Sequence, residues 1–476
     1  MTRGGAPADG GAGPRVLVVA GNSFLNGGDA ALALALAGEL TRRLPDATIT
    51  WSTRQPSLAA ALPGRRMGQP VQPWAGRTQT FLDLLGRLGP DWRVAGSVTW
   101  VTLLRPALRA WALLHRRAPR VALRLLPPVL RPIVRETLRA DAVVAMPGGY
   151  LDSLGRDDVR WMWAATPLVI AHALRVPVVL APMTIGAFPG RHIGAARRVV
   201  RDAALVLLRE ERSVPWAQRC GADPARTAIV ADMAWLTEPD PELAPATAAA
   251  LPSAADGPLV AFAVRAFGFQ NAADPAAAQE RYLAALAGLA DELVERRGAR
   301  IVFVPQSMGP PVTSLDAARD VVARMRRPEA ATVLEIAPEP GQLAAIYARM
   351  RLVVGVRMHA GILGMAAGTP SLAIAYSIKH QGIMDAVGLG DLVHPIDALD
   401  VPALRASAER ALDTEVELRA RLAERVPLQR AAAADAGARI AAIVRDRAAR
   451  RTRRARKKAA GRQGARSGGG RSGGKG

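Results

Sequence analysis

Short apolar segments that alternate with helical segments constrain the fold of this chain most strongly. In the first half they occupy residues 15–20, 47–53, 141–146, 176–182, 203–210 and 227–232. Uninterrupted apolar runs of this length, separated by helices, are typical of parallel strands that are buried on both faces. The pattern predicts a doubly wound α/β domain.

The same pattern restarts after a segment rich in Pro, Ala and Glu at residues 237–257. Its second set of apolar segments occupies residues 258–264, 299–305, 331–337, 351–356 and 371–376. We therefore predict two Rossmann-like parallel-sheet domains, at residues 15–236 and 258–444, joined by a linker at 237–257. This organisation suggests a glycosyltransferase-B-like arrangement, in which ligands bind in the cleft between the domains, beyond the carboxyl ends of the strands.

Positive charge is concentrated at the end of the chain. The formal net charge is +22, and residues 445–476 contain 13 Lys or Arg and one acid, which contributes +12. This segment has too few apolar residues to fold and predicts a disordered basic tail, and residues 1–14 predict a disordered lead. A merely solvated tail and attraction to anionic lipid headgroups both fit such a charge, whereas we do not expect nucleic acid as a partner.

Residues 92–136 form a second unusual segment, which mixes Leu, Val and Trp with many Arg and almost no acid. We predict a helical insertion. Its composition suits contact with the headgroup region of an anionic membrane, or a helical hairpin packed on the domain with its arginines at the edge.

Cys220 is the only cysteine, which excludes an internal disulfide and a cysteine-based metal cluster. We expect no metal site. No apolar segment of a secretory signal is visible near Met1. We therefore expect the protein in the cytoplasm, peripheral on the inner membrane face if its basic segments meet lipid.

Two glycine motifs follow predicted strands of the first domain. The first contains Asn26, Gly28 and Asp29, and exposed backbone N–H groups at such a helix start suit an anion, although an ordinary helix N-cap also explains it. The second contains Gly148 and Gly149, with Asp152 close behind as a candidate partner of an acceptor hydroxyl. A plain tight turn is the alternative for the second motif.

Polar side chains also follow other predicted strands. Arg209 ends the segment 203–210, where a guanidinium could bind a phosphate or carboxylate, or form a surface ion pair with Glu210 or Glu211. In the second domain Arg265 and Gln306 occupy corresponding positions. These residues predict contacts to an anionic, hydrogen-bonding ligand.

The most informative segment is 353–389. Arg357 and His359 follow a strand, and Lys379 follows the next one. Two cations and an imidazole at adjacent strand ends favour a site for a small anion with several charges, since a buried core histidine would not explain the accompanying cations.

These segments, in this order, resemble the polysaccharide pyruvyltransferase family. The resemblance runs from about Val16 to Leu389 and rests on NGGDAAL, PGGYL, VLLREERS, ADMAW and above all RMHAGILGMAAGTPSLAIAYSIKHQGIMDAVGL. Pro147 stands where the family commonly has the first of three consecutive glycines. The insertion and the basic tail lie outside the family pattern.

The resemblance implies phosphoenolpyruvate as donor, no cofactor, and a cyclic pyruvate ketal on two hydroxyls of one sugar. The acceptor would belong to a cell-surface polysaccharide or its lipid-linked oligosaccharide precursor. Arg357 and His359 match the family's Arg-x-His pair, taken to bind the donor and assist proton transfer, and Arg209 matches the arginine of an Arg-acid-x-x-Ser element.

The remaining candidates divide by expected role. Asp152 joins Arg357 and His359 as a catalytic candidate; the predicted donor contacts are Arg209, Arg265, Lys379, Gly28 and Asp29, and the predicted acceptor contacts are Gly148, Gly149, Asn26 and Gln306. Two other functions fit the sequence. One is a nucleotide-sugar-dependent glycosyltransferase of the same fold, and the other is a non-catalytic polyanion- or glycan-binding protein.

Overall fold

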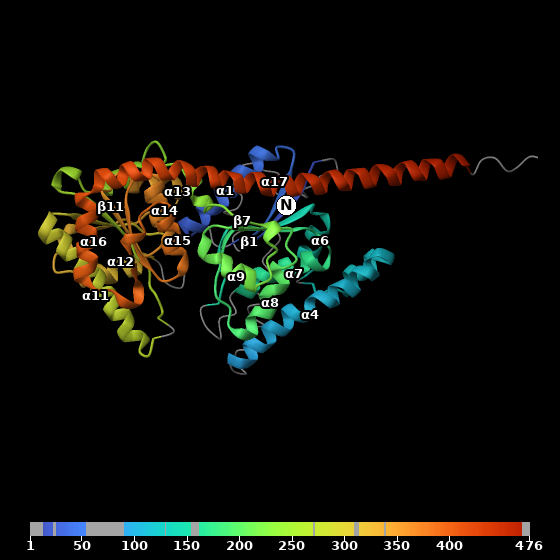
Figure 1. The fold of residues 1–476 in the computed structure, drawn as a ribbon, viewed down its shortest axis with the longest axis horizontal. Coiled ribbons are helices and arrows are strands. Elements are labelled where there is room, and N and C mark those ends of the chain that lie inside the picture. The colour runs from blue at the N-terminus through green and yellow to red at the C-terminus, as the bar shows by residue number, and fades with distance from the viewer. Residues whose placement is uncertain are drawn as a thin grey trace, which may run out of the picture.

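A computed structural model describes residues 13–21, 25–53, 90–128, 130–153, 161–269, 272–308, 314–337 and 339–468. It contains two parallel sheets side by side, each covered by helices (Figure 1). The two parallel-sheet domains predicted from the sequence are therefore confirmed.

The N-terminal sheet has seven strands in the order β2-β1-β3-β5-β6-β7, with β4 paired to β5. All of its pairings are parallel. The strands are β1 (Arg15–Gly21), β2 (Thr48–Thr53), β3 (Ala142–Ala145), β4 (Gly148–Leu151), β5 (Val178–Ile185), β6 (Leu205–Leu208) and β7 (Thr227–Ile229). The glycine pair predicted as a turn instead begins strand β4.

The C-terminal sheet has six strands in the order β10-β9-β8-β11-β12-β13, again all parallel. They are β8 (Leu259–Ala263), β9 (Arg300–Phe303), β10 (Ala331–Val333), β11 (Leu352–Gly355), β12 (Ser371–Ala375) and β13 (Val393–Pro395). This is the strand order of a Rossmann fold, in which the direction of winding reverses between the first and fourth strands.

Both reversal points carry predicted site residues. In the N-terminal sheet the reversal lies between β1 and β3, whose following segments hold Gly28 and Gly149. In the C-terminal sheet it lies between β8 and β11, which are followed by Arg265 and Arg357. Ligands of open parallel sheets bind at such points.

Helices cover both sheets. They are α1 (Gly27–Arg43), α4 (Pro90–Arg117), α5 (Pro119–Leu125), α6 (Arg131–Arg139), α7 (Trp161–Ala173), α8 (Gly190–Val200), α9 (Val214–Arg219), α10 (Pro245–Ala250), α11 (Pro275–Arg297), α12 (Ser314–Val322), α13 (Pro340–Ala348), α14 (Met358–Ala366), α15 (Ile378–Ala386), α16 (Val401–Asp413) and α17 (Glu415–Gly468). Helix α10 lies within the segment predicted as a linker. Asp240, just before α10, accepts a hydrogen bond from Gln342 of α13 at 2.7 Å, so this segment is docked on the C-terminal domain.

One hydrophobic core is continuous through both domains. It joins one face of β1 and the helix α1 to the helices α13 and α14 of the C-terminal domain. The fully buried Trp235 lies in the short 3₁₀ segment η3 (Met233–Leu236), which contacts α1, α14 and α17. Apolar packing at this junction fixes the helices whose first turns form the candidate site.

Helix α17 corrects the prediction of a tail that is disordered from Arg445 onward. It leaves the C-terminal domain, passes over the N-terminal domain and extends beyond it (Figure 1). Arg451 lies 2.8 Å from the buried carboxylate of Asp141 and donates to the carbonyl of Gly13 at 2.9 Å. The composition of this segment predicted disorder, but tertiary contacts supply the stabilisation of the helix that the segment's own sequence lacks. Residues 1–12 of the predicted lead and 469–476 of the tail lie outside the described residues.

The predicted insertion at 92–136 is helical and comprises α4, α5 and most of α6. Leu104, Leu108 and Trp111 of α4 are buried, and α4 packs against α7 and α8 of the N-terminal domain. The predicted hairpin packing is thus present on one face. In the part of the chain that the structure describes, no helix combines the length and hydropathy that a membrane span requires.

Candidate functional site

The first turn of α1 is held by the C-terminal domain. Gly27 donates its backbone N–H to the carbonyl of Gln306 at 2.8 Å, and Met308 donates to the carbonyl of Leu25 at 2.9 Å. Asn26 forms an antiparallel bridge with Ser307, and its side chain accepts from Gly28 at 3.1 Å as the N-cap of α1. The N-cap explanation of this motif is therefore correct, and the cap presents Gly28 and Asp29 at the domain junction.

His359 lies against this turn from the other side. It is the second residue of α14, whose N-cap is Arg357, so the pair stands at a helix start. A Cβ built on Gly28 would lie 2.1 Å from Nδ1 of His359. Only glycine therefore allows the imidazole to approach the backbone of α1 so closely.

We expect Gly28→Ala to displace His359 and lower any activity that depends on it by at least about tenfold, since misplacement by about 1 Å can cost about 100-fold. Gly38→Ala is the matched control in the same helix, because a Cβ on Gly38 meets nothing within 4 Å. Turnover and melting temperature of both variants would be measured. Equal turnover would show that the close approach of Gly28 to His359 has no functional role.

Arg209 follows β6 and is buried, with 3% of its surface exposed. It donates through Nε to Thr184 at 2.9 Å and through Nη1 to Asp232 at 2.5 Å. Its remaining nitrogen, Nη2, is buried and has no hydrogen-bond partner among the described residues. The surface ion pair considered from the sequence is wrong, because the contact to Glu210, at 3.5 Å, is fully buried as well.

Asp232 was not among the sequence-predicted site residues, although it lies in the ADMAW segment. Its carboxylate is fully buried, and Oδ2 lies 3.7 Å from Nε2 of His359 as well as beside Arg209. Burial alone would raise the pKa of Asp232, but Arg209 and His359 outweigh burial and hold this pKa well below its usual range. A single carboxylate thus positions both the guanidinium and the imidazole.

Gly149 of β4 brings the N-terminal domain close to Lys379 of α15. A Cβ on Gly149 would lie 2.8 Å from Nη2 of Arg209 and 3.5 Å from Nζ of Lys379. Helix α15 also packs on the segment after Arg209, where a Cβ on Gly382 would meet Glu210 at 2.8 Å. Cations from both domains therefore face the same short stretch of glycine backbone.

Arg357 and Arg265 add two further guanidinium groups. Arg357 donates through Nε to Ser314 at 3.2 Å. Burial, with the neighbouring charge of Arg265, lowers the pKa of Arg357. Within the described ranges, no carboxylate lies within 4.0 Å of the side-chain nitrogens of Arg265, Arg357 or Lys379. The site therefore has cationic charge that no acid of these ranges neutralises by direct contact.

Asp29 is the acid that faces this charge. Burial raises its pKa, while His359, Arg357, Lys379 and Arg209 each act to lower it, and the net direction is upward. All four residues are thus near enough to act on one carboxyl group, which shows that the two domains present their polar groups to a common point.

Tyr150 is a further residue that the sequence analysis missed. Its hydroxyl donates to the carbonyl of Met146, and burial raises its pKa, with Arg209 and Asp29 as charged neighbours. A tyrosine directly after paired glycines gave no specific signal in the sequence.

The side chain of one predicted residue turns away from the site. The side chain of Gln306 is buried and donates to the hydroxyl of Tyr347 at 2.7 Å, so it reaches the site only through its backbone carbonyl. Asp152 lies against Gly186, where a Cβ would come within 2.6 Å of the Cβ of Asp152. Arg357, His359, Arg209, Lys379, Gly28, Asp29 and Gly149 are brought together, with Arg265, Asn26 and Gly148 at the edges of the group.

The family model for polysaccharide pyruvyl transferase matches residues 26–378, which include nearly all of these side chains. The chain belongs to the polysaccharide pyruvyl transferase family. The amylovoran biosynthesis protein AmsJ of Erwinia amylovora is 30% identical over 89 residues, which are 19% of this chain and 21% of that protein. The matched region is thus only about a fifth of that relative's length.

Solved structures show the fold of this pyruvyl transferase family member. An MnaA–UDP complex from S. aureus matches with a TM-score of 0.54 and 9% identity over 89% of this chain and 94% of that one. A glycotransferase of kitacinnamycin matches with a TM-score of 0.52 and 14% identity, covering 91% and 99%. These likenesses establish the glycosyltransferase-B-like arrangement predicted from the sequence.

Proposed function

We propose that this family member transfers a pyruvyl group from phosphoenolpyruvate to a sugar of a cell-surface polysaccharide or its lipid-linked precursor, forming a pyruvate ketal. Family membership supports a pyruvyl-transfer role in polysaccharide biosynthesis. The observation that carries the proposal is the meeting of Arg209 and Lys379 at Gly149, with one guanidinium nitrogen of Arg209 buried and unpaired among the described residues.

The donor chemistry fits this charge. Phosphoenolpyruvate carries a phosphate and a carboxylate on adjacent positions, so it needs several cationic donors at short range. Nη2 of Arg209, in the N-terminal domain, is available to donate to the ligand. Arg357 and Lys379 lie in the C-terminal domain. Charge-assisted hydrogen bonds from both domains would then hold the donor between them.

His359 is the group proposed to protonate the donor. Transfer begins with proton addition to the methylene carbon, which makes the neighbouring carbon electrophilic toward a sugar hydroxyl. Imidazole is the side chain whose ordinary pKa lies nearest to neutral pH. Asp232, at 3.7 Å from Nε2, orients the ring, and Gly28 limits its movement on the other side.

The test is incubation of the purified protein with phosphoenolpyruvate labelled in its carbon skeleton and with lipid-linked oligosaccharides from cell membranes. The proposal expects label in the saccharide, one phosphate released per ketal, and equal activity in EDTA because no step is assigned to a metal. Arg357→Ala should lose transfer, whereas Arg349→Ala, outside the site, should retain it. Absence of phosphoenolpyruvate binding by calorimetry would overturn the proposal.

The two other functions receive less support. A nucleotide-sugar glycosyltransferase would need an acid of the C-terminal domain for the ribose, and Glu335, an acid after β10, is paired instead with Arg319 of α12 at the surface. A polyanion-binding protein would bind its partner through the basic tail. Arg451 of this tail already forms an ion pair with Asp141. Transfer of sugar from a nucleotide donor in the same assay would reinstate the first of these.

We further propose that the insertion contacts an anionic membrane surface. Leu103, Leu113, Val121 and Leu125 are 54–65% exposed on α4 and α5. Residues 92–135 contain nine Arg and no Asp or Glu. Exposed leucines among arginines without acids match the headgroup layer of an anionic bilayer. This contact would place the protein on the inner face of the membrane, where a lipid-linked acceptor is presented.

We expect the double variant Leu113→Asp/Leu125→Asp to co-sediment at least about tenfold less with vesicles of phosphatidylglycerol and phosphatidylcholine, because the charge and the lost apolar contact both oppose insertion. Val416→Asp/Leu428→Asp is the matched control, since these α17 side chains are 82% and 60% exposed. The same loss of binding in both double variants would contradict a specific role of the insertion.

A further inference from the structure

A second feature of the C-terminal domain is a cavity of about 550 Å³, which shares Arg265 with the predicted donor contacts. It is walled by the segment after β8, by α11, by the end of β12 and by the segment after β13. Ligand pockets of small molecules have volumes of about 300–1,000 Å³. The cavity therefore has room for a substrate in addition to the donor.

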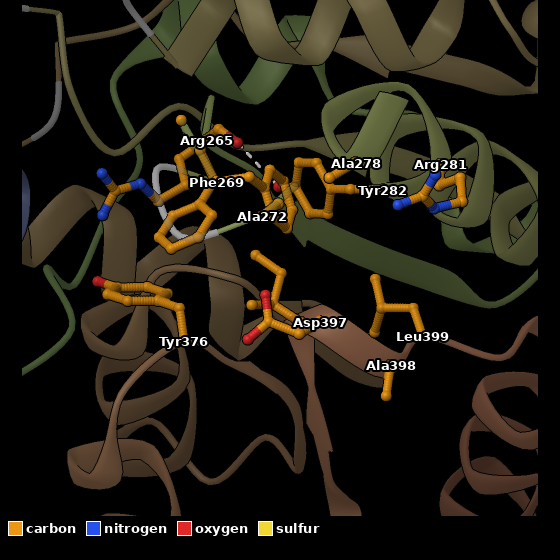
Figure 2. A pocket seen from close by; sticks show the side chains of 13 residues that line it. Arg265, Phe269, Ala272, Ala278, Arg281, Tyr282, Tyr376, Asp397, Ala398 and Leu399 are labelled. Carbon is orange, nitrogen blue, oxygen red and sulfur yellow. Dashed lines mark hydrogen bonds between the residues drawn. The ribbon is translucent and has the colours of Figure 1, made fainter. Parts of the chain in front are cut away.

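The lining combines aromatic faces with a few polar groups. Phe267, Phe269 and Tyr376 contribute rings. Arg265, Arg281 and Asp397 contribute charged groups (Figure 2). Phe269 adopts a left-handed backbone with φ of 38°, which is unusual for a bulky side chain and is retained mainly where a functional site requires it.

One end of the cavity adjoins the candidate donor site. Figure 2 shows the guanidinium of Arg265 and the ring of Tyr376 at this end, with Arg281 and Leu399 at the other. The Arg265 guanidinium lies 4.9 Å from the Tyr376 ring centre, and Nζ of Lys379 lies 5.1 Å from the same centre. Tyr376 is therefore shared between the cavity and the cations proposed to bind phosphoenolpyruvate.

We infer that this cavity binds the sugar ring that is to be pyruvylated, and that the hydroxyl of Tyr376 receives the proton of the attacking sugar hydroxyl. This inference rests on the proposed function and assigns its acceptor site. The apolar C–H face of a pyranose packs on aromatic rings, while its hydroxyls need polar partners at the edges. Phe267 and Tyr376 supply the aromatic faces for the sugar ring. Asp397 and Arg281 line the same cavity and can supply polar partners for its hydroxyls.

Charge at Tyr376 suits a proton acceptor. Burial would raise its pKa, but Lys379, Arg265 and Arg357 outweigh burial and lower this pKa to about 8. A phenol with such a pKa is partly ionised near neutral pH and can accept a proton from an alcohol in the transition state. By contrast, burial raises the pKa of Tyr282, in the same wall.

The reaction balances without a further reactant. His359 donates a proton to the methylene carbon of the donor, the sugar oxygen bonds to the neighbouring carbon, and its proton passes to Tyr376. The second hydroxyl then bonds to the same carbon as the carbon–oxygen bond to phosphate breaks. The two sugar hydroxyls together release two protons. One of them restores the proton that His359 gave to the methylene carbon, and the other leaves with the phosphate.

Filling the cavity tests the binding claim. Ala398 lines the cavity, is exposed and lies at the end away from the guanidinium of Arg265 (Figure 2), so Ala398→Trp adds bulk there. Ala254→Trp is the matched control, because this exposed alanine precedes β8 at the opposite edge of the sheet. Saturation-transfer NMR with methyl glycosides of hexoses and N-acetylhexosamines would report saccharide binding, and calorimetry would report phosphoenolpyruvate binding.

We expect the wild type and Ala254→Trp to bind a glycoside, and Ala398→Trp to lose glycoside binding but keep phosphoenolpyruvate binding. A wild type that binds no glycoside, an unchanged Ala398→Trp, or UDP binding that Ala398→Trp abolishes would each overturn the acceptor site. Failure of the donor proposal is separate, because it would appear as absent phosphoenolpyruvate binding in the wild type.

The role of Tyr376 is tested by Tyr376→Phe, which keeps the ring. We expect kcat to fall about 100-fold with an unchanged KM for the saccharide. The wild-type rate should rise with pH through about 8, whereas the variant should lose this rise. A variant with wild-type kcat and pH profile would overturn the assignment of the proton to Tyr376.

Discussion

His359→Ala is expected to lower kcat for pyruvyl transfer by at least about 100-fold and up to about 10,000-fold, the range that general acid assistance contributes. The imidazole lies between Gly28 and Asp232, and it acts on Asp29 together with the cations of both domains. Phosphate release and ketal formation should fall together, because both follow protonation of the donor.

The control for this variant is donor binding. Arg209, Arg357 and Lys379 remain, so phosphoenolpyruvate should bind to His359→Ala with an affinity similar to that of the wild type, as measured by calorimetry. His359→Gln keeps hydrogen bonding but not acidity and should be equally slow. Wild-type turnover by either variant would remove His359 from the chemical step.

Asp232→Asn is expected to cause the largest loss of stability. It would leave the guanidinium of Arg209 buried without its carboxylate, and breaking a buried ion pair in this way costs about 3–5 kcal/mol. Asp413→Asn is the matched control, because Asp413 pairs with Arg297 at the surface, where solvent screens an ion pair and its contribution to stability is small. Melting temperatures of both variants would be compared with that of the wild type.

The pH dependence of this effect has a defined sign. The pKa of Asp232 is lowered in the folded protein, whereas an unfolded aspartate titrates near about 3.9. Its stabilisation is therefore complete above that value and lost as the pH falls toward the folded pKa. The difference in melting temperature between wild type and Asp232→Asn should be constant near neutral pH and narrow below about pH 4. A difference that widens on acidification would contradict this role.

The strands were predictable because each is a buried apolar run between helices. Every apolar segment identified in the sequence overlaps a strand of the structure, namely β1, β2, β3 or one of β5 to β12. The sequence analysis did not predict strands β4 and β13. These strands, Gly148–Leu151 and Val393–Pro395, are short and contain glycine or proline. The continuation of helix α17 beyond Arg445 was not predicted, because it depends on contacts with distant residues such as Asp141.

The site was predictable only in part. Cations at strand ends stood out against apolar surroundings, so Arg209, Arg357 and Lys379 were found. Asp232 was passed over because an acid within a short segment shows no sign that it will be fully buried beside an arginine. Gln306 was misplaced because the residue after a strand end can turn either way, and here its side chain turns toward Tyr347.

The pairing of residues 25–27 with 306–308 has an evolutionary consequence. The start of α1 is encoded in the first half of the gene, yet its backbone is anchored by a loop encoded in the second half. A recombination crossover in the region of 237–257 would therefore join residues 25–27 of one parent to residues 306–308 of another. These two segments would not have coevolved. Functional hybrids between homologues should need both loops from the same parent, so this architecture resists exchange of halves.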